Sequence, residues 1–133
     1  MTFDELINEL PNGFHDAGLR DIEISYVKRC VVLHVTVHVA EDEAEQHVRD
    51  LRVTLSGVAF FVIDPPDRNY PLAEGKALWT DAGAGAPSTS HIALPALPPG
   101  ASLNWIFVNE WNSFIRFASQ TCCHEWTSDK RPA

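Results

Sequence analysis

The chain has 133 residues, of which 45% are hydrophobic and 21% are charged. This length and composition are typical of one globular domain, so residues 1–133 are treated as a single domain. Asp and Glu number 18 against 10 Lys and Arg, which gives a formal net charge of −8. A chain this acidic, with no dense basic cluster, is not expected to bind nucleic acid, and its charge favours basic partners.

Several features indicate a cytoplasmic protein that does not associate with membranes. The longest apolar run, Gly57 to Ile63, is far shorter than the ~20 residues of a membrane-spanning helix. The first residues are acidic and lack the basic and apolar regions of a secretory signal. The cysteines are odd in number, and Cys122 and Cys123 are adjacent, so no disulfide scaffold is expected.

The N-terminal segment has the features of a short helix over residues 3–10. Thr2 and Glu5 have the spacing of a capping box, which begins such a helix. Apolar residues at helical spacing predict that one side packs against a sheet. These residues are Phe3, Leu6, Ile7 and Leu10. The sequence Pro-Asn-Gly at 11–13 is expected to end the helix.

Alternating apolar and polar residues predict a β-hairpin next. Residues 21–26 and 31–39 alternate, and a turn is expected near Lys28 and Arg29. A polar connection at 41–46 leads to a strand over 51–56, after which Gly57 is expected to mark a bulge. Because Val58–Ile63 is apolar at every position, it is predicted to be the central and most buried strand.

In the second half of the chain the predicted strands are shorter and are separated by loops. The prolines within 64–71 predict a loop. Short strands are expected at 76–80 and 90–94, separated by a loop over the Gly- and Ala-rich residues 81–87. A strand is predicted over 103–108.

Residues 111–126 fit both strand and helix spacing. A hairpin through Glu110–Ser113 is favoured because aromatic and β-branched residues follow it. Residues 127–133 are expected to be frayed. The whole pattern predicts an α+β or mostly β fold. In it, a short N-terminal helix lies on an antiparallel meander of about six or seven strands, sandwich-like or half-barrel.

His15 and Asp16 form the most enzyme-like pair, because a carboxylate beside an imidazole can fix its tautomer. The same two residues also fit an ordinary turn, so catalysis by them is an alternative interpretation. No nucleophile elbow and no phosphate-binding glycine loop is present. His34 and His38 lie about 13 Å apart on one strand, too far to chelate one ion. No metal and no cofactor is expected.

An aromatic cluster lies late in the chain. Trp105, Asn109 and Trp111 could line the mouth of a binding groove, with asparagine amides orienting a ligand. Large aromatics also fill the cores of sheet domains, so a core role is the other interpretation.

Residues 10–19 read Leu-Pro-Asn-Gly-Phe-His-Asp-Ala-Gly-Leu. They begin the part of the chain that resembles known families. This opening resembles a family of small bacterial proteins with an Asn-Gly-Phe-His-Asp-Ala start. It is also similar to the immunity-protein-50-like families associated with polymorphic toxin systems. The match covers about the first forty residues and the stretch from Phe107 to Ile115. The resemblance implies a compact cytoplasmic β-rich domain with a protein-binding role and no assigned catalytic residues.

The leading functional hypothesis is therefore a non-enzymatic binding protein, immunity-like, that meets a basic protein partner through an acidic face. That face is expected to include Glu41, Asp42 and Glu43. The alternative is a small-molecule binder or enzyme that uses His15 and Asp16 near the aromatic and asparagine pocket. A third hypothesis is self-association through the valine-rich edge of the first hairpin. The oligomeric state is left open.

Overall fold

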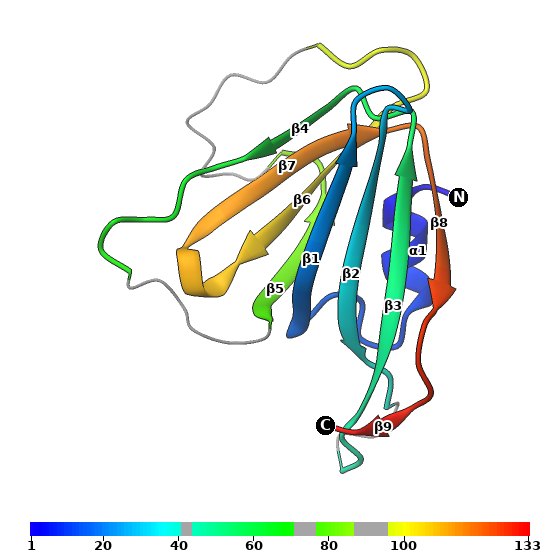
Figure 1. The fold of residues 1–133 in the computed structure, drawn as a ribbon, viewed down its shortest axis with the longest axis vertical. Helices are drawn as coiled ribbons and strands as arrows, with labels where there is room; N and C mark the ends of the chain where they lie inside the picture. Colours follow the sequence, from blue (N-terminus) through cyan, green and yellow to red (C-terminus); the bar gives the residue numbers. More distant parts are fainter. Residues whose placement is uncertain (41–43, 71–76, 87–95) are drawn as a thin grey trace.

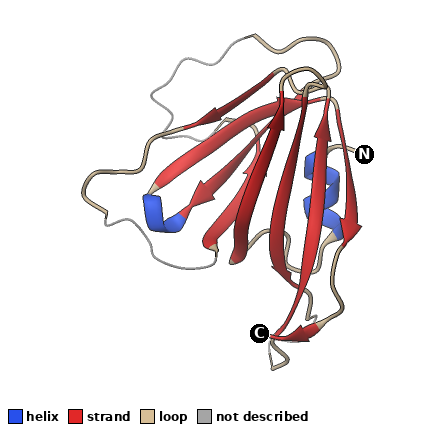
Figure 2. Ribbon diagram, viewed as in Figure 1, coloured by secondary structure: helices blue, strands red, loops and turns tan. Residues whose placement is uncertain are grey.

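A computed structural model of the chain describes residues 1–40, 44–70, 77–86 and 96–133. Within these ranges it contains one short helix and an antiparallel sheet of nine strands, which confirms the α+β, mostly β prediction (Figure 2). The elements are α1 (Phe3–Glu9), β1 (Ala17–Ser25), β2 (Cys30–His38), β3 (His47–Ser56), β4 (Phe60–Ile63), β5 (Leu78–Ala84), β6 (Ser102–Val108), the 3₁₀ turn η1 (Asn109–Trp111), β7 (Ser113–Ser119), β8 (Thr121–Trp126) and β9 (Arg131–Pro132).

The sheet bends into two half-sheets that enclose the core between them (Figure 1). The strand order in the described residues is β4-β7-β6-β5-β1-β2-β3-β8, with β9 beside β3. The strands β4, β7, β6 and β5 form one half-sheet, and β1, β2, β3 and β8 form the other. The two are joined at a short seam, where β1 pairs with β5 only through Ala17–Leu19. They are also joined at a corner where β3 passes into β4 and β7 passes into β8.

Gly57 and Gln120 form this corner. Gln120 N–H donates to the Ser56 carbonyl (3.0 Å), and Ala59 N–H donates to the Ala118 carbonyl (2.8 Å), so hydrogen bonds continue across the bend. Gly57 has a φ of +60°, and a Cβ there would lie 2.5 Å from the Gln120 side chain. The bend therefore requires glycine both for its backbone conformation and for the space beside Gln120.

Helix α1 fills one open side between the half-sheets. Both bonds of the capping box between Thr2 and Glu5 are present (2.8 and 3.2 Å), as predicted. Phe3 is fully buried and meets the rings of Phe14 and Phe117 edge-on, at 5.4 and 5.0 Å between centroids. The helix contacts β5, β6 and β8, so it bridges the two half-sheets. This packing explains why a helix of only seven residues is stable.

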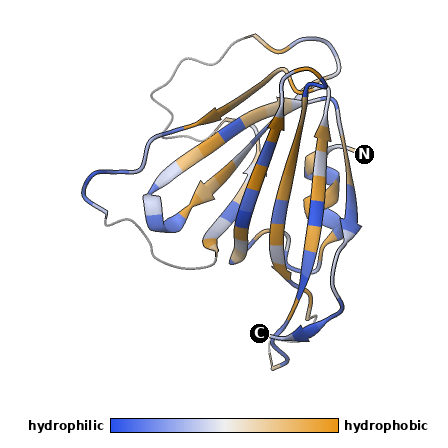
Figure 3. Cartoon of the chain, in the orientation of Figure 1, coloured by the Kyte–Doolittle hydropathy of each residue, from blue (hydrophilic) through white to orange (hydrophobic). Residues whose placement is uncertain are grey.

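The first hairpin forms as predicted, and apolar and polar bands alternate along its strands (Figure 3). β1 begins at Ala17, earlier than predicted, and its register against β2 shifts at Arg20 through a bulge. The inward residues of β2 are buried: Val31, Leu33, Val35 and Val37. Because β2 lies between β1 and β3, the valine-rich strand is not a free edge as the self-association hypothesis supposed.

The prediction that Val58–Ile63 forms the central strand is wrong. Only Phe60–Ile63 is a strand, and in the described residues it pairs with β7 alone. Phe61 stacks on Phe117 at 5.7 Å, so one face of β4 covers the core, and Ile63 shares that face but stays exposed at the end of the strand. An apolar run indicates full burial only when layers cover both of its faces.

The prediction of a loop over 81–87 is also wrong in its first part, because β5 runs on to Ala84. Small residues are needed there: a Cβ on Gly83 would lie 2.5 Å from the Trp105 ring. The strand predicted at 90–94 lies outside the described residues. The hairpin through Glu110–Ser113 is confirmed, with η1 joining β6 and β7.

The tail is not frayed as predicted. β9 pairs with β3, and the Arg131 guanidinium donates to the Asp50 carboxylate at 2.9 Å. Thr36 donates to the same carboxylate oxygen at 2.6 Å. Burial opposes ionisation of Asp50, but these hydrogen bonds and the Arg20 charge outweigh it and lower the pKa of Asp50. A few polar contacts thus order a segment whose sequence has no apolar pattern.

Candidate functional site

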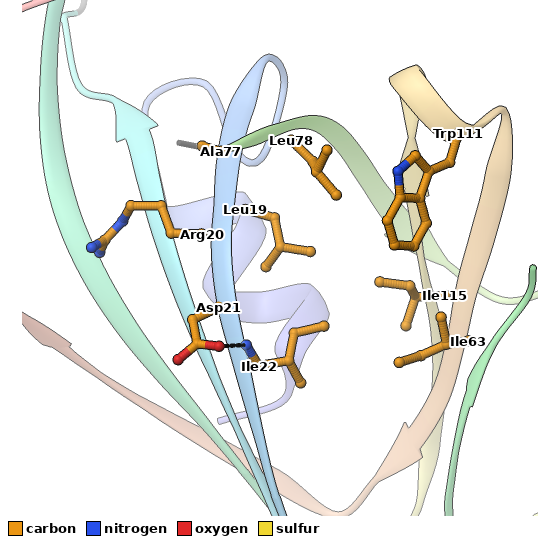
Figure 4. Close-up of a pocket in the computed structure, with 9 residues that line it drawn as sticks. All are labelled: Leu19, Arg20, Asp21, Ile22, Ile63, Ala77, Leu78, Trp111 and Ile115. Carbon is orange, nitrogen blue, oxygen red and sulfur yellow. Dashed lines mark hydrogen bonds between the residues drawn. The ribbon is translucent and has the colours of Figure 1, made fainter. Parts of the chain in front are cut away.

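The side of the core opposite α1 opens into a cleft of about 280 Å³ (Figure 4). It lies between β1 on one side and η1, β7 and β4 on the other, with β5 at its end. The residues that line it are Leu19, Arg20, Asp21, Ile22, Ile63, Ala77, Leu78, Trp111 and Ile115. Six of them are large and apolar, and in Figure 4 their side chains converge on the gap between β1 and β7.

The cleft exists because the seam between the half-sheets is short. β1 and β5 pair as far as Leu19 and Leu78, which is the first residue of β5, and the register of β1 against β2 shifts just beyond, at Arg20. Beyond that point Ile22 and Ile24 still point inward, because they pair with the buried residues of β2. Ile24 is nevertheless 51% exposed, and Ile63 across the cleft is 46% exposed. The sequence places apolar residues on this face, but the fold leaves them accessible.

The polar groups at the cleft are few and are already engaged. Asp21 accepts a hydrogen bond from the N–H of Ile22 at 2.9 Å. The Arg20 guanidinium lies 3.5 Å from the Val35 carbonyl and 3.9 Å from the Asp50 carboxylate. A site with this lining favours an apolar group with a few charges at its rim. Among the described residues that line it, no acid–base pair that could activate a substrate is present.

His15 lies between two carboxylates, Asp16 and Asp81. Its Nδ1 is 3.3 Å from Asp81, and its Nε2 is 3.5 Å from Asp16. The hydrogen bond to Asp81 and the charge of Asp16 raise the pKa of His15 above 6.5. Of these two contacts, only the one between Nδ1 and Asp81 is a hydrogen bond, and it holds the ring against β5. The arrangement favours a surface contact that ties the loop before β1 to β5.

This cluster lies on the outer face of the sheet, away from the cleft. Asp81 sits between Thr80, which is fully buried, and Ala82, which packs on the core. Since neighbours in a strand point to opposite faces, Asp81 and the His15 bound to it face outward. The structure therefore brings His15 and Asp16 together with Asp81, a partner that sequence reasoning did not identify.

The segment at residues 12–16 has a structural explanation. The Asn12 amide donates to the carbonyls of His38 (3.3 Å) and Ala40 (3.1 Å) at the end of β2. Gly13 has a φ of +53°, with Ile7 within 2.8 Å of where a Cβ would lie. Phe14 enters the core. Each position in this motif helps to connect α1 to β1.

Trp105 and Trp111 do not share one mouth. Trp105 lies over Gly83 and meets Phe114 edge-on, and its neighbours Asn104 and Ile106 are buried. It therefore points to the outer face. Trp111 lines the cleft on the inner side. Asn109 is exposed at the start of η1, so the three residues do not form a common groove.

The acidic residues Glu41, Asp42 and Glu43 lie outside the described residues. On the outer face, charged side chains pair across strands. His34 Nε2 lies 2.7 Å from the Glu23 carboxylate, and Arg52 pairs with Glu125. Glu23 and Asp21 are on β1, so acidic groups also stand beside the cleft.

One buried ion pair lies apart from the cleft and from the His15 cluster. Arg116, only 3% exposed, pairs with the Asp64 carboxylate beyond the end of β4. Because β7 pairs with β4, this ion pair holds the end of β4 against β7. Removing one partner would leave the other charged and buried, which indicates a structural role.

In the described ranges, no three His, Cys, Asp or Glu side chains are grouped so that they could hold a metal ion. Cys122 is buried, and burial raises the pKa of its thiol to about 11, so it is not a reactive thiolate. No helix in the described part of the chain is long and apolar enough to cross a membrane.

Of the residues that line the cleft, the sequence singled out Trp111 as a binding residue and missed the others. Ile22 and Ile24 show the alternation of a half-buried strand, which does not reveal that the facing strand diverges. Comparisons with models of protein families, with curated proteins and with solved structures each found no match to this chain.

Proposed function

We propose that the protein is a non-enzymatic binding domain that recognises a protein partner by taking an apolar side chain into the cleft between its half-sheets. The observation that carries this proposal is a cleft of about 280 Å³ whose lining is mostly apolar and includes Ile63, which is 46% exposed. Apolar pockets that stay open at a protein surface commonly bind a ligand or a partner.

The charge of the chain favours a basic partner. The net charge of −8 accelerates the encounter with basic proteins, and Asp21 and Glu23 stand next to the cleft. The resemblance to immunity-protein-50-like families supports the same role, since immunity proteins act by binding another protein. Contact of Glu41, Asp42 and Glu43 with the basic partner remains part of the proposal.

Catalysis by His15 is the less favoured alternative. Its two nitrogens already face Asp81 and Asp16, and the ring lies on the outer face, away from the cleft.

Selection of a displayed library of short random peptides tests the proposal. We expect peptides enriched against the wild-type protein to contain an apolar anchor and basic residues, and to bind the Ile63→Asp variant at least tenfold more weakly. A charge at that position would disrupt an apolar contact, and the position is exposed enough to keep the fold. Leu97→Asp, at a similarly exposed apolar residue (44%) that does not line the cleft, is the matched control. Enriched peptides that bind both variants like the wild type would refute the cleft as the binding site.

A further inference from the structure

The cleft is bordered by β1, one edge of which is only partly paired with another strand among the described residues. Among the described residues, β1 pairs with β2 along its whole length but with β5 only through Ala17–Leu19. On the side facing the cleft, residues 21–25 therefore have no strand beside them in the described part of the chain. In an antiparallel pair, alternate residues turn their N–H and C=O groups away from the partner strand.

A hydrogen bond identifies which residues face this edge. The Ile22 N–H is bound by the neighbouring Asp21 carboxylate at 2.9 Å (Figure 4). An amide that bonds its own neighbour's side chain is not donating to β2, so Ile22 belongs to the set that faces the edge. By alternation, Ile24 belongs to the same set. The edge therefore presents the backbone groups of Ile22 and Ile24 beside the cleft, and the Ile22 N–H has to exchange the Asp21 carboxylate for the carbonyl of an added strand.

We propose that the partner binds by strand addition: an extended segment pairs with residues 21–25 of β1 and inserts alternate side chains into the cleft. This inference rests on the proposed function and specifies the partner. Binding of an extended peptide to a sheet edge takes affinity from backbone hydrogen bonds and specificity from alternate side chains. Both requirements are met at one place here.

The side chains of β1 define the chemistry of the segment. Ile22 lines the cleft and Ile24 points to the same face of β1, whereas Asp21 and Glu23 point to the outer face. A strand added beside β1 shares this alternation, so its inward residues meet isoleucines and its outward residues meet carboxylates. The partner segment is therefore one in which apolar and basic residues alternate.

The same charges disfavour a second copy of this chain as the occupant. Two β1 edges paired with each other would bring Asp21 and Glu23 close to the same residues of the other copy. Like charges directly across a strand pair are destabilising, and acidic groups on an edge strand are a known protection against self-pairing. A concentration-dependent dimer abolished by Ile22→Lys would contradict the assignment to a basic partner.

The test uses a synthetic peptide of about seven residues in which valine and lysine alternate, a length typical of one strand. Two versions carry N-methyl groups, one on the odd and one on the even backbone amides. A peptide paired as a strand presents one set of amides to β1 and the other to solvent. We therefore expect one version to bind at least tenfold more weakly by calorimetry and the other to bind nearly like the unmodified peptide. Equal affinity of the two methylated versions, or no binding of the unmodified peptide, would overturn strand addition.

Variants of the protein test whether Asp21 and Glu23 select a basic segment. Asp21→Asn combined with Glu23→Gln is expected to weaken binding of the valine–lysine peptide severalfold and to reduce its dependence on salt. Glu125→Gln, an acidic residue on the outer face of β8, is the matched control and should change neither. If peptides from the random library bind through Ile63 while N-methylation has no directional effect, the cleft stands as a binding site and only strand addition fails.

Discussion

The two open sides of the core differ in how they are completed. On one side α1 inserts Phe3 and Leu6, both fully buried, between the half-sheets. On the other side no helix covers Ile22, Ile24 and Ile63 in the described residues, and a cleft remains. The same kind of apolar side chain thus supports the fold on one side and stays accessible on the other. Burial by a covering element, rather than residue type, decides which role such a residue has.

The largest effect is expected on the filled side. Phe3→Ala removes a ring that contacts Phe14 and Phe117 edge-on, and it should lower the free energy of unfolding by about 3–5 kcal/mol. Urea denaturation followed by fluorescence measures the change. A loss below about 1 kcal/mol would show that the packing of α1 is not needed for stability. The filled side and the open side would then not differ in what they contribute to the fold.

The corner that sets the angle between the half-sheets should respond next. Gly57→Ala places a Cβ beside Gln120 at a φ of +60°, and it is expected to cost roughly 1–3 kcal/mol. Adding Gln120→Ala relieves the clash but not the backbone strain, so the double variant should recover part of the loss. Complete recovery would show that φ at Gly57 carries no cost.

A smaller and pH-dependent effect is expected at the seam. The carboxylate of Asp81 raises the pKa of His15, so its stabilising contribution is full below pH 6.5 and is lost as pH rises through the folded-state pKa. For so exposed a pair, Asp81→Asn should lower the free energy of unfolding by only a few tenths of a kcal/mol. The loss should be seen at about pH 5.5 and vanish at about pH 9. Thermal unfolding at the two pH values measures it, and a loss that is equal at both would exclude His15 as its source.

The smallest effect is expected on the open side. Ile24→Thr keeps a β-branched residue in β1 and removes apolar surface that is already half exposed, so stability should change by less than about 0.5 kcal/mol. Affinity for peptides that occupy the cleft should nevertheless fall. A stability loss comparable to that of Phe3→Ala would mean that Ile24 belongs to the core and that the cleft is closed in solution.

Local patterns in the sequence predicted most elements correctly. The capping box at Thr2 and Glu5 and the alternation along β1, β2 and β3 depend on neighbouring residues, and each led to the right element. The errors arose where distant segments decide the outcome. Val58–Ile63 was expected at the centre because it is apolar, yet its position at the edge depends on β7. The tail was expected to fray, yet Arg131 finds Asp50, which lies eighty-one residues earlier in the chain.

The candidate site shows the same division more sharply. The alternation of Ile22 and Ile24 with Asp21 and Glu23 is visible in the sequence and sets which side chains share a face, because strand geometry has a period of two. That this face opens into a cleft depends on β1 and β5 pairing over only three residue pairs, and on Trp111 of η1 and Ile63 of β4 arriving from distant segments. Hydrophobic patterning is local and therefore readable from neighbouring residues, whereas accessibility depends on which distant segment covers a face, and only the tertiary structure settles that.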